Sequence, residues 1–127
     1  RHQTPATPNL PALYGLHVSL KMMMAEGLDA IQARHEHIGA YCRQGALDLG
    51  LTLYADPRHA SNTVSALGLP QGISAEDVLE KLRVGYDIIC AASKDPRVEV
   101  IRIGHMGYVS VADIDAVFAA LAAILVA

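Results

Sequence analysis

Apolar residues recur at three- and four-residue spacing over the first part of the chain, and this period restricts the region to amphipathic helix. The first repeat consists of Leu10, Leu13, Leu16, Leu20, Met23 and Met24. It predicts a helix from about Leu10 to Glu26, and Gly27 marks its end. A second repeat predicts a helix from Leu28 to Leu49, and Gly50 ends it.

Short strands and two further helices follow. Apolar and β-branched runs bounded by turn residues predict strands at Leu51 to Ala55, Thr63 to Leu69, Asp87 to Cys90 and Val98 to Ile103. Ser74 predicts the start of a helix that runs to about Gly85, and Ser110 predicts the start of a final apolar helix. This order of elements predicts an α+β domain, in which helices cover one side of a mostly antiparallel sheet of three or four strands.

Size and composition agree with one core and exclude some partners. The chain has 127 residues, of which 52% are hydrophobic and 5% aromatic, and its net charge of −3 argues against nucleic acid and anionic membranes as partners. The most apolar stretch, Val109 to Ala127, is too short to cross a bilayer and contains Asp113 and Asp115. Cys42 and Cys90 lack the spacing of a metal site, so we expect reduced, buried thiols on core elements and a cytoplasmic location.

One cation, Arg102, interrupts the last predicted strand just before Gly104 and Gly107. The β-branched neighbours favour a strand, and the glycines permit a close backbone turn. A guanidinium group offers a planar fork that fits a carboxylate with two hydrogen bonds. The residues alone leave two interpretations, of which composition favours the first: a surface arginine on an edge strand, or an anchor for a carboxylate.

The histidines do not predict a metal site. His35 and His37 are two residues apart, which on a helix separates their rings by about 200°, so we expect a solvated helix face. His59 and His105 have no second ligand nearby in the sequence, and we expect His105 to hydrogen-bond the glycine turn that follows the strand. The sequence also lacks nucleophile, phosphate-loop and dinucleotide motifs.

The first helix carries the methionine cluster Met22, Met23 and Met24 in addition to its leucines. One sheet cannot cover two faces of a helix, so an isolated domain would leave apolar surface of the kind that usually marks an interface. Alternatively, the methionines fill gaps in the core.

Several segments together resemble a known family. The string Arg102-Ile103-Gly104-His105-Met106-Gly107 resembles the substrate-carboxylate segment of class V aminotransferases, which include the alanine–glyoxylate and serine–glyoxylate aminotransferases. Four more segments resemble family signatures in the family order: the Thr-Pro pair within Arg1 to Thr7, Glu26-Gly27-Leu28, Arg34-His35 and Leu49-Gly50-Leu51. The resemblance covers essentially the whole chain and implies the small C-terminal domain of the fold-type I pyridoxal-phosphate enzymes.

The resemblance implies a transaminase that moves an amino group between a small amino acid, alanine- or serine-like, and an oxo acid such as glyoxylate or pyruvate. The cofactor would be pyridoxal phosphate. Arg102 would bind the substrate carboxylate, and Thr4 would reach the cofactor phosphate across a dimer interface. Lys21, Lys81 and Lys94 do not fit the role of the lysine that forms the Schiff base. The resemblance implies that this lysine belongs to the family's large domain. We therefore expect no catalytic residue here and no activity of the chain alone.

The resemblance also implies boundaries and partners. Residues 1–9 would be an interdomain segment and residues 10–127 the small domain, with the large domain of the same protein and a second subunit of a homodimer as partners. Because the chain begins with Arg1, we expect it to be a fragment. Where the family has a glycine-rich stretch before the arginine, this chain has Ala91-Ala92, so we expect a different loop near the substrate. Two alternatives remain open: a stand-alone module that binds an amino acid through Arg102 without catalysis, and a structural dimerisation module.

Overall fold

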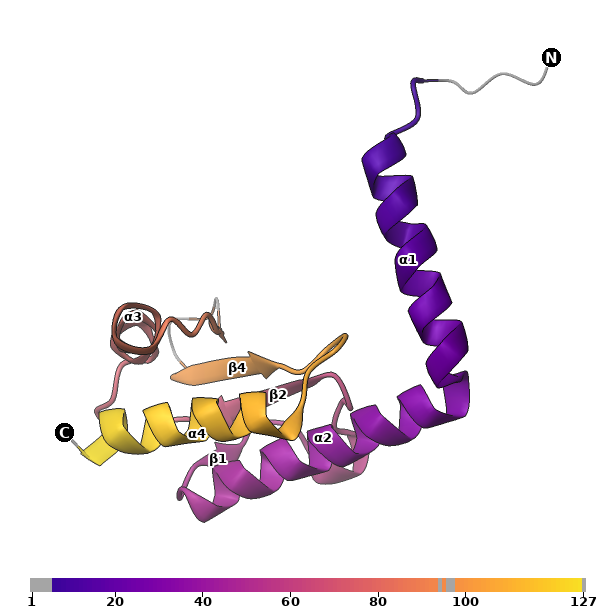
Figure 1. Ribbon diagram of the computed structural model, residues 1–127. Coiled ribbons are helices and arrows are strands. Elements are labelled where there is room, and N and C mark those ends of the chain that lie inside the picture. Colours follow the sequence, from indigo (N-terminus) through magenta and orange to yellow (C-terminus); the bar gives the residue numbers. More distant parts are fainter. Residues whose placement is uncertain (1–5, 94, 96–97, 127) are drawn as a thin grey trace. The chain divides into compact units, whose positions relative to one another are not determined.

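The computed structural model describes residues 6–93, 95 and 98–126 (Figure 1). Contacts divide the chain into two compact units, one that ends at Arg34 and one that begins at His35. The elements in chain order are α1 (Leu10–Glu26), α2 (Leu28–Asp48), β1 (Thr52–Leu53), the 3-10 turn η1 (Pro57–His59), β2 (Val64–Gly68), α3 (Ala75–Tyr86), β3 (Ala91–Ala92), β4 (Val100–Gly104) and α4 (Val111–Val126). The predicted helices are confirmed, with ends that differ by at most one residue from the predicted ends.

The first unit consists of α1 and the beginning of α2. The side chain of Asn9 caps α1 by accepting a hydrogen bond from the Ala12 N–H at 3.2 Å. Gly27 ends the helix with φ at +88° and ψ at 142°, close to a region of backbone conformation that essentially only glycine occupies. Arg34 of α2 forms an ion pair with Glu26 of α1, with 2.5 Å between Nε and Oε1. No residue of α1 is buried.

The second unit is a sheet with helices on one side. Its four strands are all antiparallel and lie in the order β1-β2-β4-β3. The buried side chains of α2, α3 and α4 form one core with those of the sheet. The largest fully buried hydrophobic side chains of this core are Leu67, Leu82, Ile101, Ile103, Ile114 and Leu121. The predicted α+β class and antiparallel sheet are therefore confirmed.

Local capping accounts for the starts of α3 and α4. Ser74 accepts a hydrogen bond from the Asp77 N–H at 3.3 Å, as predicted. At α4, the Asp113 N–H donates to Ser110 Oγ at 3.3 Å and the Ser110 N–H donates to the Asp113 carboxylate at 2.8 Å. This reciprocal pair is a capping box, and the two hydrogen bonds from Ser110 lower the pKa of Asp113.

Two predicted strands differ from the structure. The strand predicted at Asp87 to Cys90 is wrong, because this segment ends α3: Asp87 takes a left-handed conformation with φ at +56°, and the Ile88 N–H donates to Leu82 O at 3.1 Å. Pairing with β4 begins only at β3. The strand predicted at Leu51 to Ala55 shortens to β1, because the chain bends after it into η1.

The two cysteines differ in their surroundings. Cys42 on α2 is fully buried, whereas Cys90 is half-buried and lies between α3 and β3, outside any helix or strand. The prediction that both lie on core elements is thus wrong for Cys90. Burial raises the pKa of both thiols, which disfavours the reactive thiolate. None of the described helices has the length and apolar character needed to cross a membrane.

Candidate functional site

Arg102 lies at the middle of β4, on the side of the sheet opposite the core. Ile101 and Ile103 are buried in the core, whereas Arg102 and Gly104 are exposed. Because successive side chains of a strand lie on opposite faces, Arg102 extends from the face that the core does not use. We call this the open face of the sheet.

The strand register surrounds Arg102 with small side chains. Ala66 of β2 lies opposite Arg102 on one side, and Ala91 of β3 lies opposite it on the other. An alanine side chain ends at Cβ, so neither neighbouring strand fills the space beside the guanidinium. β4 is an inner strand, so the alternative of an arginine on an edge strand is wrong. Ala91 and Ala92 form the edge strand β3.

The guanidinium keeps most of its hydrogen-bonding capacity. Arg102 Nη2 donates to the backbone oxygen of Ala92 at 3.1 Å. Ion pairs in the described part of the chain join Glu26 to Arg34 and Asp56 to Arg58, and neither includes Arg102. One carbonyl uses a single N–H of the group, so a fork of two N–H donors stays available for a carboxylate.

A buried polar cluster lies on the core side of the same strand. His105 is fully buried and Ser65 is 4% exposed. Ser65 Oγ is 3.0 Å from His105 Nε2, and the backbone oxygen of Asn62 is 3.1 Å from His105 Nδ1. The prediction that His105 bonds the glycine turn is therefore wrong. It shares strand parity with Ile101 and Ile103, and this two-residue period was the sequence signal for its burial.

Burial lowers the pKa of His105, and the positive charge of Arg43 and the nearby His35 act in the same direction. The hydrogen bond to Asn62 opposes this shift but is the weaker effect. His105 is thus a neutral residue near neutral pH. The Cys42 thiol also reaches the Ser65 hydroxyl, a contact that lowers its pKa less than burial raises it.

The other histidines lie in different environments. His37 is exposed and its ring is 6.3 Å from that of Tyr41, as a solvated helix face predicts. His35 is half-buried, with its Nδ1 atom enclosed and without a partner among the described residues. The prediction of a solvated face is therefore wrong for His35, because its part of α2 packs over the polar cluster. No group of three potential metal ligands occurs in the described ranges.

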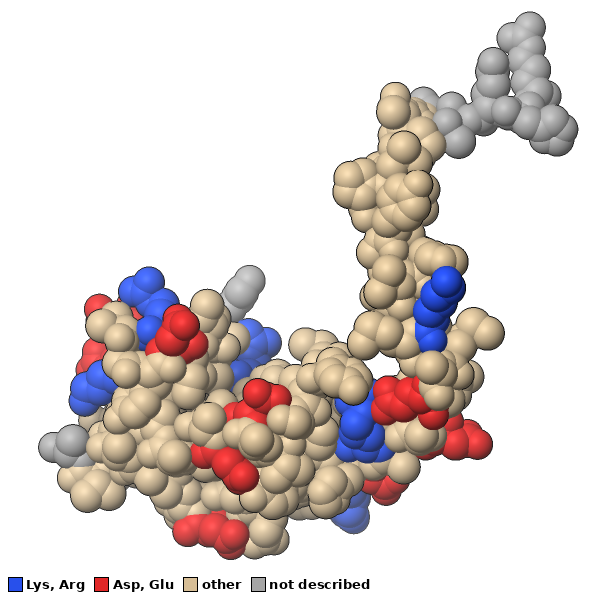
Figure 2. Space-filling view, viewed as in Figure 1, with Lys and Arg blue, Asp and Glu red and all other residues tan. Residues whose placement is uncertain are grey.

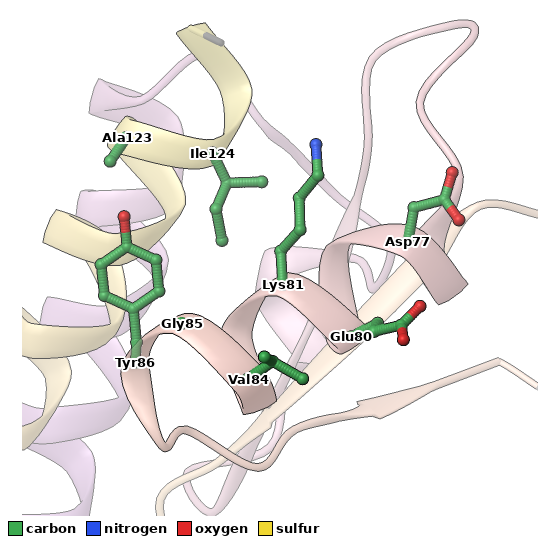
Figure 3. A pocket seen from close by; sticks show the side chains of 8 residues that line it. All are labelled: Asp77, Glu80, Lys81, Val84, Gly85, Tyr86, Ala123 and Ile124. Atoms are coloured by element: carbon green, nitrogen blue, oxygen red, sulfur yellow. The ribbon is translucent and has the colours of Figure 1, made fainter.

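Thr4 and the lysines were the residues considered for contact with a cofactor. Thr4 and Lys94 lie outside the described residues. Lys81 is exposed on α3, which packs on the core side of the sheet, away from the open face. Figure 3 shows Lys81 beside Tyr86 and Ile124 in a shallow groove between α3 and α4. This groove does not include Arg102.

α1 presents an apolar surface. Met22, Met23 and Met24 are 50%, 42% and 84% exposed. Lys21 and Glu26 are the charged residues of this helix, and most of the helix face that Figure 2 shows is tan.

Comparisons with known proteins point to one family. No family profile matches the chain. The chain is 36% identical over 105 residues to serine–glyoxylate aminotransferase from Methylorubrum extorquens, covering 81% of this chain and 26% of that protein. A solved structure, ureidoglycine–glyoxylate aminotransferase from Bacillus subtilis, superposes with a TM-score of 0.88 at 32% identity and covers 98% of this chain and 32% of that one. The chain belongs to the class V aminotransferase family.

Within this family the chain is equivalent to the C-terminal third. It spans about a quarter to a third of the length of the curated relatives that it matches. One such relative, 38% identical over 126 residues, is named the small subunit of a soluble hydrogenase from Synechococcus sp. and is covered over 33% of its length. Aminotransferases of this family depend on pyridoxal phosphate.

Proposed function

We propose that this chain is the carboxylate-binding part of a pyridoxal-phosphate aminotransferase. The enzyme would move an amino group between an alanine- or serine-like amino acid and an oxo acid such as glyoxylate or pyruvate. The observation that carries the proposal is Arg102, an exposed cation on an inner strand, flanked by alanines and hydrogen-bonded only to one carbonyl among the described residues. Both substrates carry a carboxylate next to the reacting carbon, and a guanidinium fork holds that group in one orientation.

Arg102 would bind the substrate carboxylate and orient the substrate, and other groups would carry out the transfer of the amino group. When bound, the cofactor supplies the electron sink for carbanion chemistry. The lysine that binds it would come from the large domain, and Thr4 of this chain would contact its phosphate. Lys81 lies on the opposite side of the sheet from Arg102, so it is not suited to form a Schiff base beside a substrate held there. The chain alone should therefore be inactive.

The partners would be the large domain of the same protein and a second subunit of a homodimer. Residues 1–9 would link the two domains, and residues 10–127 would form the small one. The exposed leucines and methionines of α1 support this arrangement, since each 100 Å² of apolar surface that a partner covers contributes about 2.5 kcal/mol before the cost of association. Buried thiols with raised pKa values fit a cytoplasmic location.

The decisive experiment is Arg102→Lys in the polypeptide that includes the large domain. Lysine keeps the charge but loses the fork, and a charge-assisted hydrogen bond is worth roughly 1.5–3 kcal/mol, so kcat/KM should fall about tenfold to a hundredfold. Cofactor absorbance should not change. Arg83→Lys, on the exposed side of α3, is the matched control and should leave the kinetics unchanged. Unchanged kinetics in Arg102→Lys, or equal loss of cofactor and substrate binding, would refute the proposal.

The alternative is a stand-alone module that binds an amino acid or dimerises without catalysis. The α1 helix, in which no residue is buried, favours an interface of some kind. Sedimentation of the 127-residue chain, together with calorimetric titration of the chain with pyruvate, separates the possibilities. Tight pyruvate binding without a second domain would support the stand-alone binding module. A dimer that binds no carboxylate, from a chain that restores no activity to a separately produced large domain, would support the structural module.

A further inference from the structure

The hydrogen bonds of His105, on the core side of the sheet, join the end of β4 to the beginning of β2. The backbone N–H of His105 donates to Thr63 O at 2.9 Å. Its Nδ1 lies 3.1 Å from Asn62 O, and its Nε2 lies 3.0 Å from Ser65 Oγ. One residue thus makes three hydrogen bonds to the segment from Asn62 to Ser65.

The partners determine the tautomer of the ring. A backbone oxygen only accepts hydrogen bonds, so Nδ1 carries the proton and donates to Asn62. Nε2 is then an acceptor, and the Ser65 hydroxyl donates to it. Both ring nitrogens are satisfied inside a site from which water is excluded, so any displacement of the ring would leave buried polar atoms without partners.

These bonds select one strand register. In the observed register Ser65 lies opposite Ile103, and Ala66 lies opposite Arg102. A slip of one residue would turn Arg102 toward the core and His105 toward solvent. A slip of two residues would keep the faces but move the guanidinium by about 7 Å along the sheet. Both slips would separate His105 from its hydrogen-bond partners at the beginning of β2. The small or apolar side chains elsewhere on β4 distinguish the observed register from the others less strongly than these hydrogen bonds do.

Helix α2 packs closely against the cluster of His105, Ser65 and Asn62. At Gly39 an added Cβ would lie 3.3 Å from His105 Cε1 and 3.2 Å from Asn62 Cα, so the helix backbone approaches the ring closely. Arg43 of α2 donates to Ser61 O at 2.9 Å. The helix therefore holds both His105 and the turn to which His105 is bonded.

We propose that His105 is a positioning residue that fixes the register of β4 on β2 and thereby sets the place of Arg102 on the open face. This inference rests on the proposed function, in which Arg102 binds the substrate carboxylate. His105 itself touches no substrate, because it lies on the opposite side of the strand from Arg102.

The test uses the polypeptide with both domains and bound cofactor. His105→Ala should raise KM for the amino acid and the oxo acid about tenfold, with kcat changed less, because the carboxylate anchor moves relative to the reacting carbon. His105→Asn places an amide N–H near the position of Nδ1 and should restore most of the affinity. His59→Ala, a histidine exposed in η1, is the matched control and should leave KM unchanged.

A purely structural role gives a different result: fewer folded molecules and a lower Tm, with normal KM in those that remain. That result in His105→Ala, beside a raised KM in Arg102→Lys, would overturn the positioning role and leave the proposed function intact. A normal KM in Arg102→Lys would overturn the proposed function itself.

Ser65→Ala gives a second test that disturbs packing little. In the 127-residue chain it should accelerate hydrogen exchange of the His105 amide, which bonds Thr63 O, more than that of the Tyr54 amide, which bonds Ala66 O across β1 and β2. Equal acceleration at both amides would indicate general destabilisation and contradict the proposal.

Discussion

Replacing Gly39 by alanine tests the packing of α2 on the polar cluster. Gly39 is buried within α2, and an added Cβ would lie 3.1 Å from Arg43 Nη1, 3.2 Å from Asn62 Cα and 3.3 Å from His105 Cε1. The Arg43 side chain can rotate away. Asn62 Cα belongs to the backbone, and the His105 ring is held by hydrogen bonds, so neither can yield without further loss.

The expected magnitude is a balance of two effects. In a helix interior, alanine is more stabilising than glycine by about 1 kcal/mol, because of its higher helix propensity. Inserting a methyl group into a well-packed site costs about 1–3 kcal/mol, and the two rigid neighbours favour the upper half of that range. Gly39→Ala should therefore lower the free energy of unfolding by about 1–2 kcal/mol. Gly85→Ala is the matched control: this glycine lies near the end of α3 with nothing within 4 Å, so it should gain about 0.5 kcal/mol.

Urea unfolding and thermal unfolding, both followed by circular dichroism, measure the two variants on the full chain. The changes in stability of the two variants should have opposite signs, and their Tm values should differ by roughly 8 °C at about 4 °C per kcal/mol. In the double variant Gly39→Ala/His105→Ala the methyl group meets one neighbour fewer, so the combined loss should be smaller than the sum of the single losses. If Gly39→Ala is as stable as the parent chain, or more stable, the close approach of α2 to His105 is refuted.

Three further results are expected. Burial lowers the pKa of His105 in the folded state below its ordinary value of 6.5, so the unfolded chain binds more protons in acid. The contribution of this residue to stability is full above 6.5 and is lost as pH falls from there through the lower folded-state pKa, so the free energy of unfolding of His105→Gln should decline less steeply than that of the parent chain as pH falls from 7 to 5. Ser110→Ala removes one side of the capping box and should lower the free energy of unfolding by about 1 kcal/mol in the same assay. Ser110→Asp keeps a side-chain oxygen that can accept from the Asp113 N–H, so this variant should retain most of the stability that the cap provides. Asp87→Gly should raise stability by about 1 kcal/mol, because glycine adopts the left-handed conformation at this position without strain; an unchanged Tm would contradict the conformation.

The sequence by itself determined the helices. Their ends depend on residues that act within one turn: Asn9 and Ser74 accept hydrogen bonds from the N–H groups of their own helices, and Gly27 and Gly50 take positive φ values just beyond the ends. Such interactions need no distant partner, so the local pattern was sufficient. The segment from Arg102 to Gly107, through its resemblance to the family motif, likewise indicated the family and the candidate carboxylate anchor from the order of its residues alone.

The tertiary structure alone decided how far the short strands extend. Both β1 and β3 are two residues long, and each exists only where a neighbouring strand offers hydrogen bonds. β-Propensity reports how a residue fits a half-buried pleated surface, not where its partner begins. For this reason the segment from Asp87 to Cys90 was predicted as a strand although it completes the end of α3.

The surroundings of Arg102 and His105 depended on the same long-range pairing. Alternation along β4 predicts that the two side chains lie on opposite faces, but only the register with β2 and β3 sets alanines beside Arg102 and Ser65 beside His105. The hydrogen bond from His105 to Asn62 joins residues 43 positions apart, and no periodicity within one segment reports such a contact. The sequence thus supplied the groups and their local order, and the sheet and α2 supplied the distances between them.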